Sequence, residues 1–343
     1  MLVTVVRPGE LGATEAQLWA EFQRRSPDLH SPFLSLTFAK VVDRARPSAR
    51  VAIAEEAGSI EAFLPFEVGS DHIGLPLGAP MNDLQGLVSS GVPLDMRAIV
   101  RGAKLRGWRF FHAPEAQSDL SAHRYAGTTV NCPVMEFGDG FEAYLSKVRA
   151  NSKSLLTKNA GQRRALERRV GEITLEWDAP TPDRLAQLVA WKSETFQRMQ
   201  TYDLFSDRSA VQIIEEIAVT READCRGLVN TLSAPDHVIA THLSICGPQQ
   251  LGAWFMGYDS TLSQYSVGTI LILTEAQRAS EEGYTGVDLG YGQHWYKFRL
   301  ATGSYPVSGG AVWASGLEKG ARALYRRFRE RTRNEKSGAR PPD

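Results

Sequence analysis

The chain has 343 residues, of which 43% are hydrophobic and 23% are charged, and its 39 basic side chains balance 39 acidic ones. This composition is typical of a globular protein, and a net charge of zero excludes the overall positive charge that many nucleic-acid-binding domains carry. At roughly 100–200 residues per domain, the length predicts two domains.

The cysteines and the apolar segments narrow the class further. Cys132, Cys225 and Cys246 lie far apart and none belongs to a C-x-x-C pair, so we expect neither a disulfide framework nor a metal site. No run of 18 or more apolar residues predicts a transmembrane helix, and the first residues lack the basic and apolar regions of a signal peptide. We therefore expect a cytoplasmic protein.

The first 138 residues alternate predicted helices with an antiparallel sheet. Thr14 fits the start of a helix whose apolar face includes Trp19, and Ala57-Gly58-Ser59 joins two β-like runs as a hairpin. In chain order we expect a strand at 2–6, helices at 14–25 and 35–44, strands at 51–55 and 60–68, a loop-rich segment at 74–91, a helix at 96–104 and a strand at 108–112.

A second unit, at 139–316, follows a similar order of elements, which places both units in the α+β class. One long helix is predicted over 141–170, with Gly171 as its stop signal. After it we expect a strand at 173–177, helices at 182–199 and 209–221, strands at 228–233, 238–246 and 251–258, a helix at 268–282 and a strand at 286–289. The remaining 317–343 predict a basic helix and a disordered tail.

The loop before the predicted helix at 268–282 has the features of a phosphate site. The first turn of a helix presents unpaired N–H groups and a partial positive charge, and Gly268 lets a phosphate approach the backbone closely. Plain capping of the helix by Ser266 explains the same residues. The Walker pattern G-x-x-x-x-G-K-[ST] is absent.

Four motifs in this region, in their order and spacing, resemble those of the acetyltransferase domain of the CelD/BcsL type. This group of the GNAT superfamily is related to Fem-type transferases and is associated with bacterial cellulose and exopolysaccharide synthesis. The motifs are Tyr258-Asp259, Tyr265-Ser266-Val267-Gly268, Asp288-Leu289-Gly290-Tyr291-Gly292 and Tyr296-Lys297. Val267 stands where the family usually has proline. Weaker similarity extends the likeness over roughly residues 1–315, at Ser31-Pro32-Phe33, Leu64-Pro65-Phe66 and the loop 82–86.

The resemblance implies two GNAT-like domains, each a mixed, mostly antiparallel sheet flanked by helices, at 1–138 and 139–316. It also implies acetyl-CoA or another acyl-CoA as co-substrate, held in a splayed gap between the strand ending at Tyr258 and the strand at 287–289. An N–H group near 256–258 would polarise the thioester oxygen. The residues expected to bind the co-substrate are Met256, Tyr258, Ser266, Val267, Gly268 and Thr269.

Three residues are candidates for acid–base chemistry. Asp288, at a strand end, has a carboxylate suited to accept a proton, or it braces the glycine turn that follows it. His242 lies inside a predicted strand and is either a base or a structural histidine. Tyr296 stands where the resemblance implies a tyrosine that protonates the leaving thiolate, the alternative being an exposed helix start.

Four further residues are candidates for substrate binding. Lys297 is suited to pair with a phosphate or an acidic group. Trp254 offers an aromatic surface for a sugar ring, although tryptophan more commonly packs in a core. Asp83 and Gln85 lie in a loop rich in Gly and Pro, where ligand contact competes with turn chemistry. We also expect His294 and Trp295 near the acceptor.

Basic side chains are concentrated in two segments of an otherwise neutral chain. These are Lys147, Arg149, Lys153, Lys158, Arg163, Arg164, Arg168 and Arg169, and then Lys319, Arg322, Arg326, Arg327, Arg329, Arg331 and Arg333. They are compatible with an anionic acceptor, a regulatory nucleotide, a membrane surface or RNA, or with solvated helix faces. The net charge makes nucleic acid the least favoured partner.

The leading hypothesis is an acyl-CoA-dependent N- or O-acyltransferase that acetylates a sugar or polysaccharide precursor in exopolysaccharide biosynthesis. The alternatives are a Fem-type transferase that uses aminoacyl-tRNA and a non-catalytic GNAT-fold binding or regulatory protein. The acceptor, the acyl chain and the oligomeric state are not encoded in any motif that we recognise.

Overall fold

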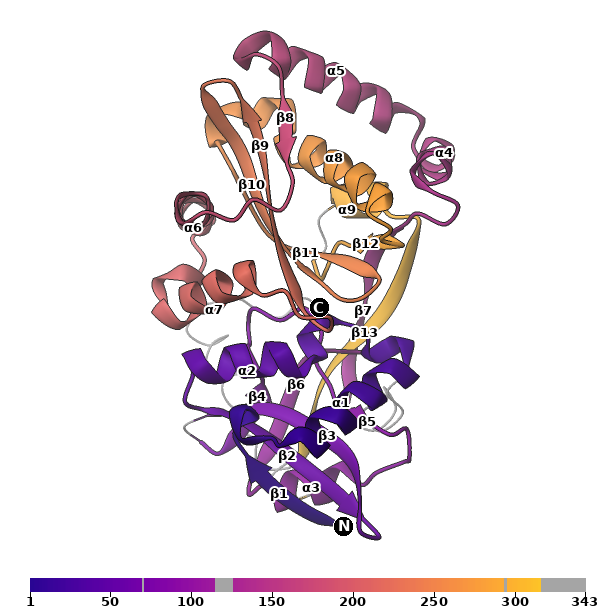
Figure 1. The fold of residues 1–343 in the computed structure, drawn as a ribbon, viewed down its shortest axis with the longest axis vertical. Helices are drawn as coiled ribbons and strands as arrows, with labels where there is room; N and C mark the ends of the chain where they lie inside the picture. The colour runs from indigo at the N-terminus through magenta and orange to yellow at the C-terminus, as the bar shows by residue number, and fades with distance from the viewer. Residues whose placement is uncertain (70, 115–125, 293–294, 316–343) are drawn as a thin grey trace, which may run out of the picture.

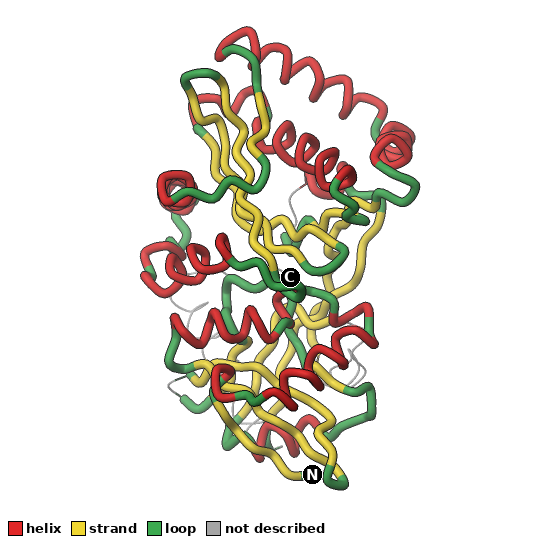
Figure 2. The backbone as a smooth tube through the Cα atoms, viewed as in Figure 1, coloured by secondary structure: helices red, strands yellow, loops and turns green. Residues whose placement is uncertain are grey.

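The computed structural model describes residues 1–69, 71–114, 126–292 and 295–315. In that part of the chain one continuous sheet links the two halves of the molecule, and helices pack on its faces (Figure 1). The N-terminal half lies below the C-terminal half in this view. The same view in Figure 2 shows strands running from one half into the other. The two halves therefore share a sheet.

The N-terminal half holds the hairpin and the helices that the sequence predicts. Its elements are β1 (Leu2–Val6), α1 (Ala13–Arg25), α2 (Leu36–Ala45), β2 (Ala49–Glu56), β3 (Ser59–Val68), β4 (Ile73–Pro76), β5 (Val88–Ser89), α3 (Met96–Gly102), β6 (Gly107–Pro114) and β7 (Ala126–Glu136). Ser35 begins α2 because its side chain accepts a hydrogen bond from the Phe38 N–H. Ala57 and Gly58 turn the β2–β3 hairpin with positive φ angles of 50° and 85°, as a type I′ turn requires.

The C-terminal half contains the three consecutive strands that the sequence predicts. Its elements are α4 (Phe141–Asn151), α5 (Lys153–Val170), β8 (Thr174–Glu176), α6 (Pro182–Arg198), α7 (Arg208–Val219), β9 (Arg226–Ala234), β10 (His237–Cys246), β11 (Gln250–Tyr258), α8 (Val267–Glu281), β12 (Gly286–Asp288), α9 (Trp295–Leu300) and β13 (Gly303–Trp313). Thr181 and Asp207 cap α6 and α7 with their side chains. The fold is α+β, with a mixed and mostly antiparallel sheet.

The order of strands shows how the halves are joined. It runs β1-β2-β3-β4-β6-β13-β7-β12-β11-β10-β9-β8, with β5 paired to β3. The last strand, β13, inserts between β6 and β7, and β7 pairs in turn with β12. Strands from both sides of the predicted domain boundary at residue 138 are therefore paired with one another in the sheet. The boundary itself stays a prediction, and the predicted basic helix and tail at 317–343 lie outside the described residues.

A hydrophobic core joins the halves on one face of the sheet. Phe38 and Phe63 from the N-terminal half belong to the same buried cluster as Ile213 and Leu243 from the C-terminal half. At the edge of this cluster Thr37 donates to Asp224 at 2.6 Å, and Arg44 pairs with Glu216. Burial of aromatic and aliphatic side chains on this scale holds two elements in fixed positions.

One predicted element is wrong, because the helix expected over 141–170 is two helices. The break is at Ser152, whose backbone (φ −150°, ψ 77°) is not helical. The N–H of Ser152 still bonds the Val148 carbonyl at 2.8 Å, and Arg299 donates to the Ser152 hydroxyl at 2.8 Å. A serine that bonds its neighbours outside the helix favours such an end. The break turns α5 along the outer side of α8 (Figure 1).

Candidate active site

The pairing of β11 with β12 stops part-way along β11, and we call the unpaired stretch between the two chain segments the gap. The two parallel strands share only the pairs Gln250–Gly286, Leu251–Val287 and Gly252–Asp288. Beyond these pairs β11 continues to Tyr258, whereas β12 ends at Asp288. The second half of β11 and the chain after Asp288 therefore diverge, as the resemblance implied.

A β-bulge lies at the start of this divergence. In the β10–β11 ladder Leu243 faces Phe255 and Ser244 faces Ala253, so Trp254 has no partner residue. A bulge leaves one residue without its ladder hydrogen bonds and changes the direction of its backbone groups. The Trp254 indole N–H donates to the Met81 carbonyl of the N-terminal half at 2.6 Å. Trp254 is thus an anchor between the halves, at the point where the gap begins.

The loop before α8 is held in an unusual conformation. Ser266 has left-handed backbone angles (φ 54°, ψ 45°), which cost a non-glycine residue about 1 kcal/mol or more. Its hydroxyl accepts a hydrogen bond from the Gln162 side chain of α5 at 2.8 Å. A Cβ at Gly268 would lie 3.2 Å from the Met256 sulfur. The first turn of α8 therefore faces β11 across the gap, and any side chain at Gly268 would enter it.

Acidic residues from both halves meet at the end of β12. Asp288 accepts hydrogen bonds from the Gly290 N–H at 2.8 Å and from the Tyr305 hydroxyl at 2.6 Å. A Cβ at Gly290 would lie 2.2 Å from Asp83 Oδ2, so Asp83 of the N-terminal half sits directly on this glycine turn. The Lys297 ammonium donates to the Leu289 carbonyl at 2.6 Å. We call Asp83, Asp288, Tyr305 and Lys297 the junction cluster.

The junction cluster has unusual electrostatics. Burial raises the pKa of Asp83 to about 7, and the neighbouring charge of Asp288 adds to the rise, while Lys297 and the Tyr291 N–H oppose it. Burial also raises the pKa of Asp288, against the hydrogen bonds from Tyr305 and Gly290 and the charge of Lys297. Burial lowers the pKa of Lys297, although both carboxylates oppose this. A buried carboxylate beside a second one, with its pKa raised toward neutral pH, suits acid–base chemistry.

His242 lies elsewhere, in the interior between the sheet and α8. Its Nδ1 is 2.7 Å from Glu275 of α8, and both side chains are 2% exposed. Ser244 also contacts the ring, at 3.4 Å. This buried pair ties α8 to β10. The arrangement gives no support to a catalytic role for His242.

The other candidates divide between the gap and the interior. Burial raises the pKa of Tyr296 in α9, and the nearby Tyr258 of β11 adds to the rise. Gln85 is 3% exposed and accepts hydrogen bonds from the Phe111 and His112 N–H groups, so it braces its loop. Val267 is buried, whereas Thr269 is partly exposed in the first turn of α8. His294 lies outside the described residues, and the Trp295 side chain is 66% exposed.

Two members of the site had no signal in the sequence. Tyr305 lies on β13, a strand rich in Gly and Pro that shows no clear alternation. Lys192 of α6 lies near Lys297, and burial followed by this repulsion lowers its pKa. Both residues reach the site only through the fold.

Cys132 borders the junction cluster, beside Tyr305, but none of the three cysteines is a reactive thiolate. Burial raises the pKa of Cys132 to about 12 and that of Cys246 to about 12, and it also raises the pKa of Cys225, so none of them is a ready thiolate. Over the described residues no group of three His, Cys, Asp or Glu side chains is placed to hold a metal ion. Within the same ranges every helix is too short or too polar to span a bilayer.

Comparison with known proteins agrees with this geometry. Residues 154–298 match the family model described as an acetyltransferase (GNAT) domain. This segment, which is less than half of the chain, is similar to GNAT acyltransferase domains. It runs from α5 to α9 and includes β11, the loop before α8, and Asp288. The search of curated proteins found no match.

Solved structures share the fold over most of both chains. The C-terminal domain of a putative lysylphosphatidylglycerol synthetase from Agrobacterium fabrum is 13% identical, with a TM-score of 0.54 over 91% of this chain and 95% of that one. FemX is 12% identical, with a TM-score of 0.54 over 91% and 96%. A tandem GNAT protein from the clavulanic acid biosynthesis pathway is 10% identical, with a TM-score of 0.52 over 91% and 98%. At such identities the likeness is one of fold.

Proposed function

We propose that this acyltransferase moves an acyl group, most simply acetyl, from acyl-CoA to an amine or hydroxyl of its acceptor. The observation that carries the proposal is the meeting of Asp83 and Asp288, one from each half, where β11 and β12 diverge. Acyl-CoA supplies an activated thioester carbonyl. The protein then needs to position the acceptor, remove its proton and polarise that carbonyl.

The donor side of the gap fits a pyrophosphate. The first turn of α8 carries the partial positive charge of a helix N-terminus, and Gly268, which packs close to the Met256 sulfur, adds no side chain to it. Gln162 holds Ser266 in the conformation that begins this turn. Met256, Tyr258 and the segment 266–269 would form the walls of the donor site.

The acceptor side fits proton removal by a carboxylate. Asp83 takes the proton as the acceptor bonds to the carbonyl carbon, since its pKa of about 7 keeps part of the population ionised at neutral pH. Asp288, held by Tyr305 and Gly290, keeps Asp83 and the glycine turn in place. Tyr296 gives a proton to the departing sulfur. Backbone N–H groups at the Trp254 bulge polarise the carbonyl oxygen, close to the 256–258 segment expected from the sequence.

The acceptor proposed here is a sugar or a polysaccharide precursor in exopolysaccharide biosynthesis. This part rests on the resemblance of the DLGYGQHWYK segment to the CelD/BcsL type. The proposed cellular site is the cytoplasm.

The experiment that tests the donor site is calorimetric titration with acetyl-CoA. We expect micromolar binding by the wild-type protein and none by Gly268→Arg, whose side chain would fill the cradle. Gly161→Arg is the matched control, because a Cβ at Gly161 meets nothing within 4 Å. Absence of binding by the wild-type protein would overturn the proposal. Equal binding by both variants would remove the pyrophosphate from this loop.

A second candidate function is Fem-type transfer from aminoacyl-tRNA. The observation that favours it is the exposed basic face of α5, which includes Lys153, Lys158, Arg164, Arg168 and Arg169. The shared fold with FemX is compatible with this function. Retention of tRNA on a filter at physiological salt, without affinity for acetyl-CoA, would favour it over the CoA-dependent reaction.

A further inference from the structure

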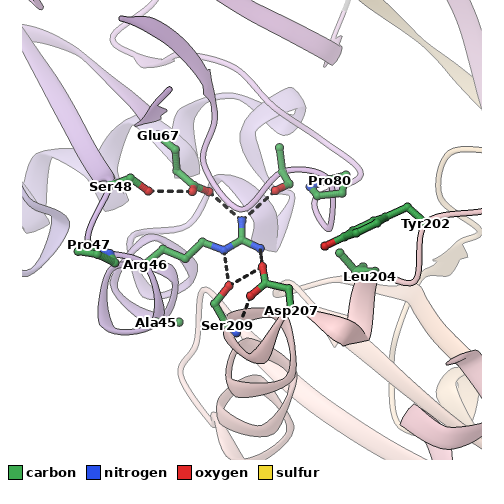
Figure 3. A pocket seen from close by; sticks show the side chains of 11 residues that line it. Ala45, Arg46, Pro47, Ser48, Glu67, Pro80, Tyr202, Leu204, Asp207 and Ser209 are labelled. Atoms are coloured by element: carbon green, nitrogen blue, oxygen red, sulfur yellow. Dashed lines mark hydrogen bonds and ion pairs between the residues drawn. The ribbon is translucent and has the colours of Figure 1, made fainter. Parts of the chain in front are cut away.

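A cavity of about 410 Å³ lies between the two halves, away from the junction cluster. Figure 3 shows it between Arg46, Glu67 and Pro80 of the N-terminal half and Tyr202 and Asp207 of the C-terminal half. Its volume falls within the roughly 300–1,000 Å³ of ordinary ligand pockets. The family match and the motifs of the sequence do not account for it.

Arg46 suggests an anion site, but most of its N–H groups are already bound within the protein. A guanidinium has five N–H donors. Nε donates to Ser209 at 2.9 Å, and Nη1 donates to Glu67 at 3.0 Å and to the Ala79 carbonyl at 2.8 Å. Nη2 faces Asp207 at 3.6 Å and the Met81 sulfur at 3.9 Å. Three of the five donors are thus held by oxygen atoms of the protein, and the two on Nη2 face Asp207 and a weak sulfur acceptor.

The two serine hydroxyl groups of the lining are also used as donors. Ser48 donates to Glu67 at 3.1 Å, and Ser209 donates to Asp207 at 2.8 Å. What remains open is acceptor capacity, above all on Asp207, whose side chain is 41% exposed. Arg46 carries one positive charge against the two negative charges of Glu67 and Asp207, so the lining is negative by one charge. Such a lining favours a ligand that donates hydrogen bonds.

Tyr202 adds an aromatic wall to this polar lining. It is 70% exposed, and in Figure 3 it lies across the opening from Arg46, with its hydroxyl on the side of the cavity. Pro80 and Leu204 lie next to it. An exposed ring with a polar tip, beside carboxylates that accept hydrogen bonds, suits a flat group whose edge carries donors.

We infer that this cavity binds a polyhydroxylated group, uncharged or bearing an amine, with the chemistry of an amino sugar. Asp207 and Glu67 accept its hydrogen bonds and Tyr202 covers one face. The net negative charge of Arg46, Glu67 and Asp207 taken together disfavours an anionic sugar.

The cavity is connected to the junction cluster through one loop. Arg46 holds the Ala79 carbonyl, and Glu67 accepts from the Gly78 N–H at 2.8 Å. The same loop continues to Met81, held by Trp254, and to Asp83. The inference rests on the proposed function in one respect: the group in the cavity is then a distal part of the acceptor whose reactive atom lies at Asp83.

The test is ligand-observed NMR titration of the full chain with D-glucosamine and with D-glucose 6-phosphate. We expect saturable binding of glucosamine and weaker binding of the phosphate. In Asp207→Asn the affinity for glucosamine should fall roughly fivefold or more, because a charged acceptor is lost while asparagine still caps α7. Tyr202→Ala should weaken binding, and Tyr202→Phe should weaken it less. Asp203→Asn is the matched control, since Asp203 caps the short helix Leu204–Ser206 and lies outside the cavity.

The outcomes separate this inference from the proposed function. Preference for the phosphate, no binding of either sugar, or equal glucosamine affinity in Asp207→Asn and Asp203→Asn would overturn it. Titration of the same variants with acetyl-CoA reports on the donor site alone. Glucosamine binding that depends on Asp207, in a protein that does not bind acetyl-CoA, would sustain the cavity and reject the acyl-CoA reaction.

Discussion

On the donor side of the gap, β11, the loop before α8 and α8 itself follow one another along the chain. On the acceptor side, Asp83 comes from a loop of the N-terminal half, Asp288 from β12 and Tyr305 from the strand that inserts between the halves. The donor side is thus a mostly local structure that also packs against α5. The acceptor side exists only when the two halves are assembled.

This difference indicates how the two sides tolerate change. A contiguous strand, loop and helix keep their geometry by short-range hydrogen bonds. The acceptor side depends on the anchors between the halves, which are the bond of Trp254 to Met81 and those of Arg46 to Ser209 and Asp207. If the proposed roles hold, changes in the N-terminal half should alter the acceptor side more than the donor side.

The largest expected effect comes from removing the carboxylate of Asp83. Asp83→Asn should lower kcat by about 10²–10⁴-fold, the usual contribution of a general base, while the Kd for acetyl-CoA stays unchanged. Asp288→Asn should lower kcat less, since the Asp288 carboxylate already accepts hydrogen bonds from Tyr305 and Gly290. Thiol release in steady state gives kcat and calorimetry gives Kd. Thermal melting checks that both variants fold.

If Asp83→Asn retains wild-type kcat, the acceptor side does not need the N-terminal half for chemistry. The comparison between a local donor side and an assembled acceptor side would then fail at its main point.

A smaller effect is expected in the pH profile. The pKa of Asp83 is raised from 3.8 to about 7, so at pH 6 most of the population is protonated and cannot act as a base. We expect kcat/KM to rise about tenfold per pH unit below pH 7 and to level off above it. The rising limb should disappear in Asp83→Asn. A limb that persists in this variant would have to be assigned to the acceptor amine or to another group.

The sequence predicts most of the donor side because its signals are local. The periodicity of α8 and the turn between β10 and β11 indicate the elements, and the motif around Gly268 indicates the loop. The break at Ser152 and the strands β7 and β13 are not predicted. β13 carries Gly303, Pro306, Gly309 and Gly310, which hide the alternation of a strand.

The site shows the same limit. Asp83, Asp288 and Lys297 can each be singled out from motifs, but no spacing in the sequence places Asp83 on the Gly290 turn. His242 looks equally suited to act as a base until the structure shows Glu275 beside it, both side chains being buried. Pairing across the fold decides which polar residues are structural, and such pairing leaves no local pattern.

The smallest expected effect concerns the hydrogen bond between α5 and the loop before α8. Gln162→Ala removes the hydrogen bond that holds Ser266 in its left-handed conformation. One hydrogen bond contributes about 0.5–1.5 kcal/mol, so the Kd for acetyl-CoA should rise about 2–10-fold, with little change in kcat. Gln277→Ala is the control, because Gln277 is exposed on the outer side of α8 and bonds Glu281 there. If the two variants bind acetyl-CoA equally, the first turn of α8 keeps its conformation without the hydrogen bond from Gln162. If Gln162→Ala abolishes binding, α5 is part of the donor site and both sides of the gap depend on assembly.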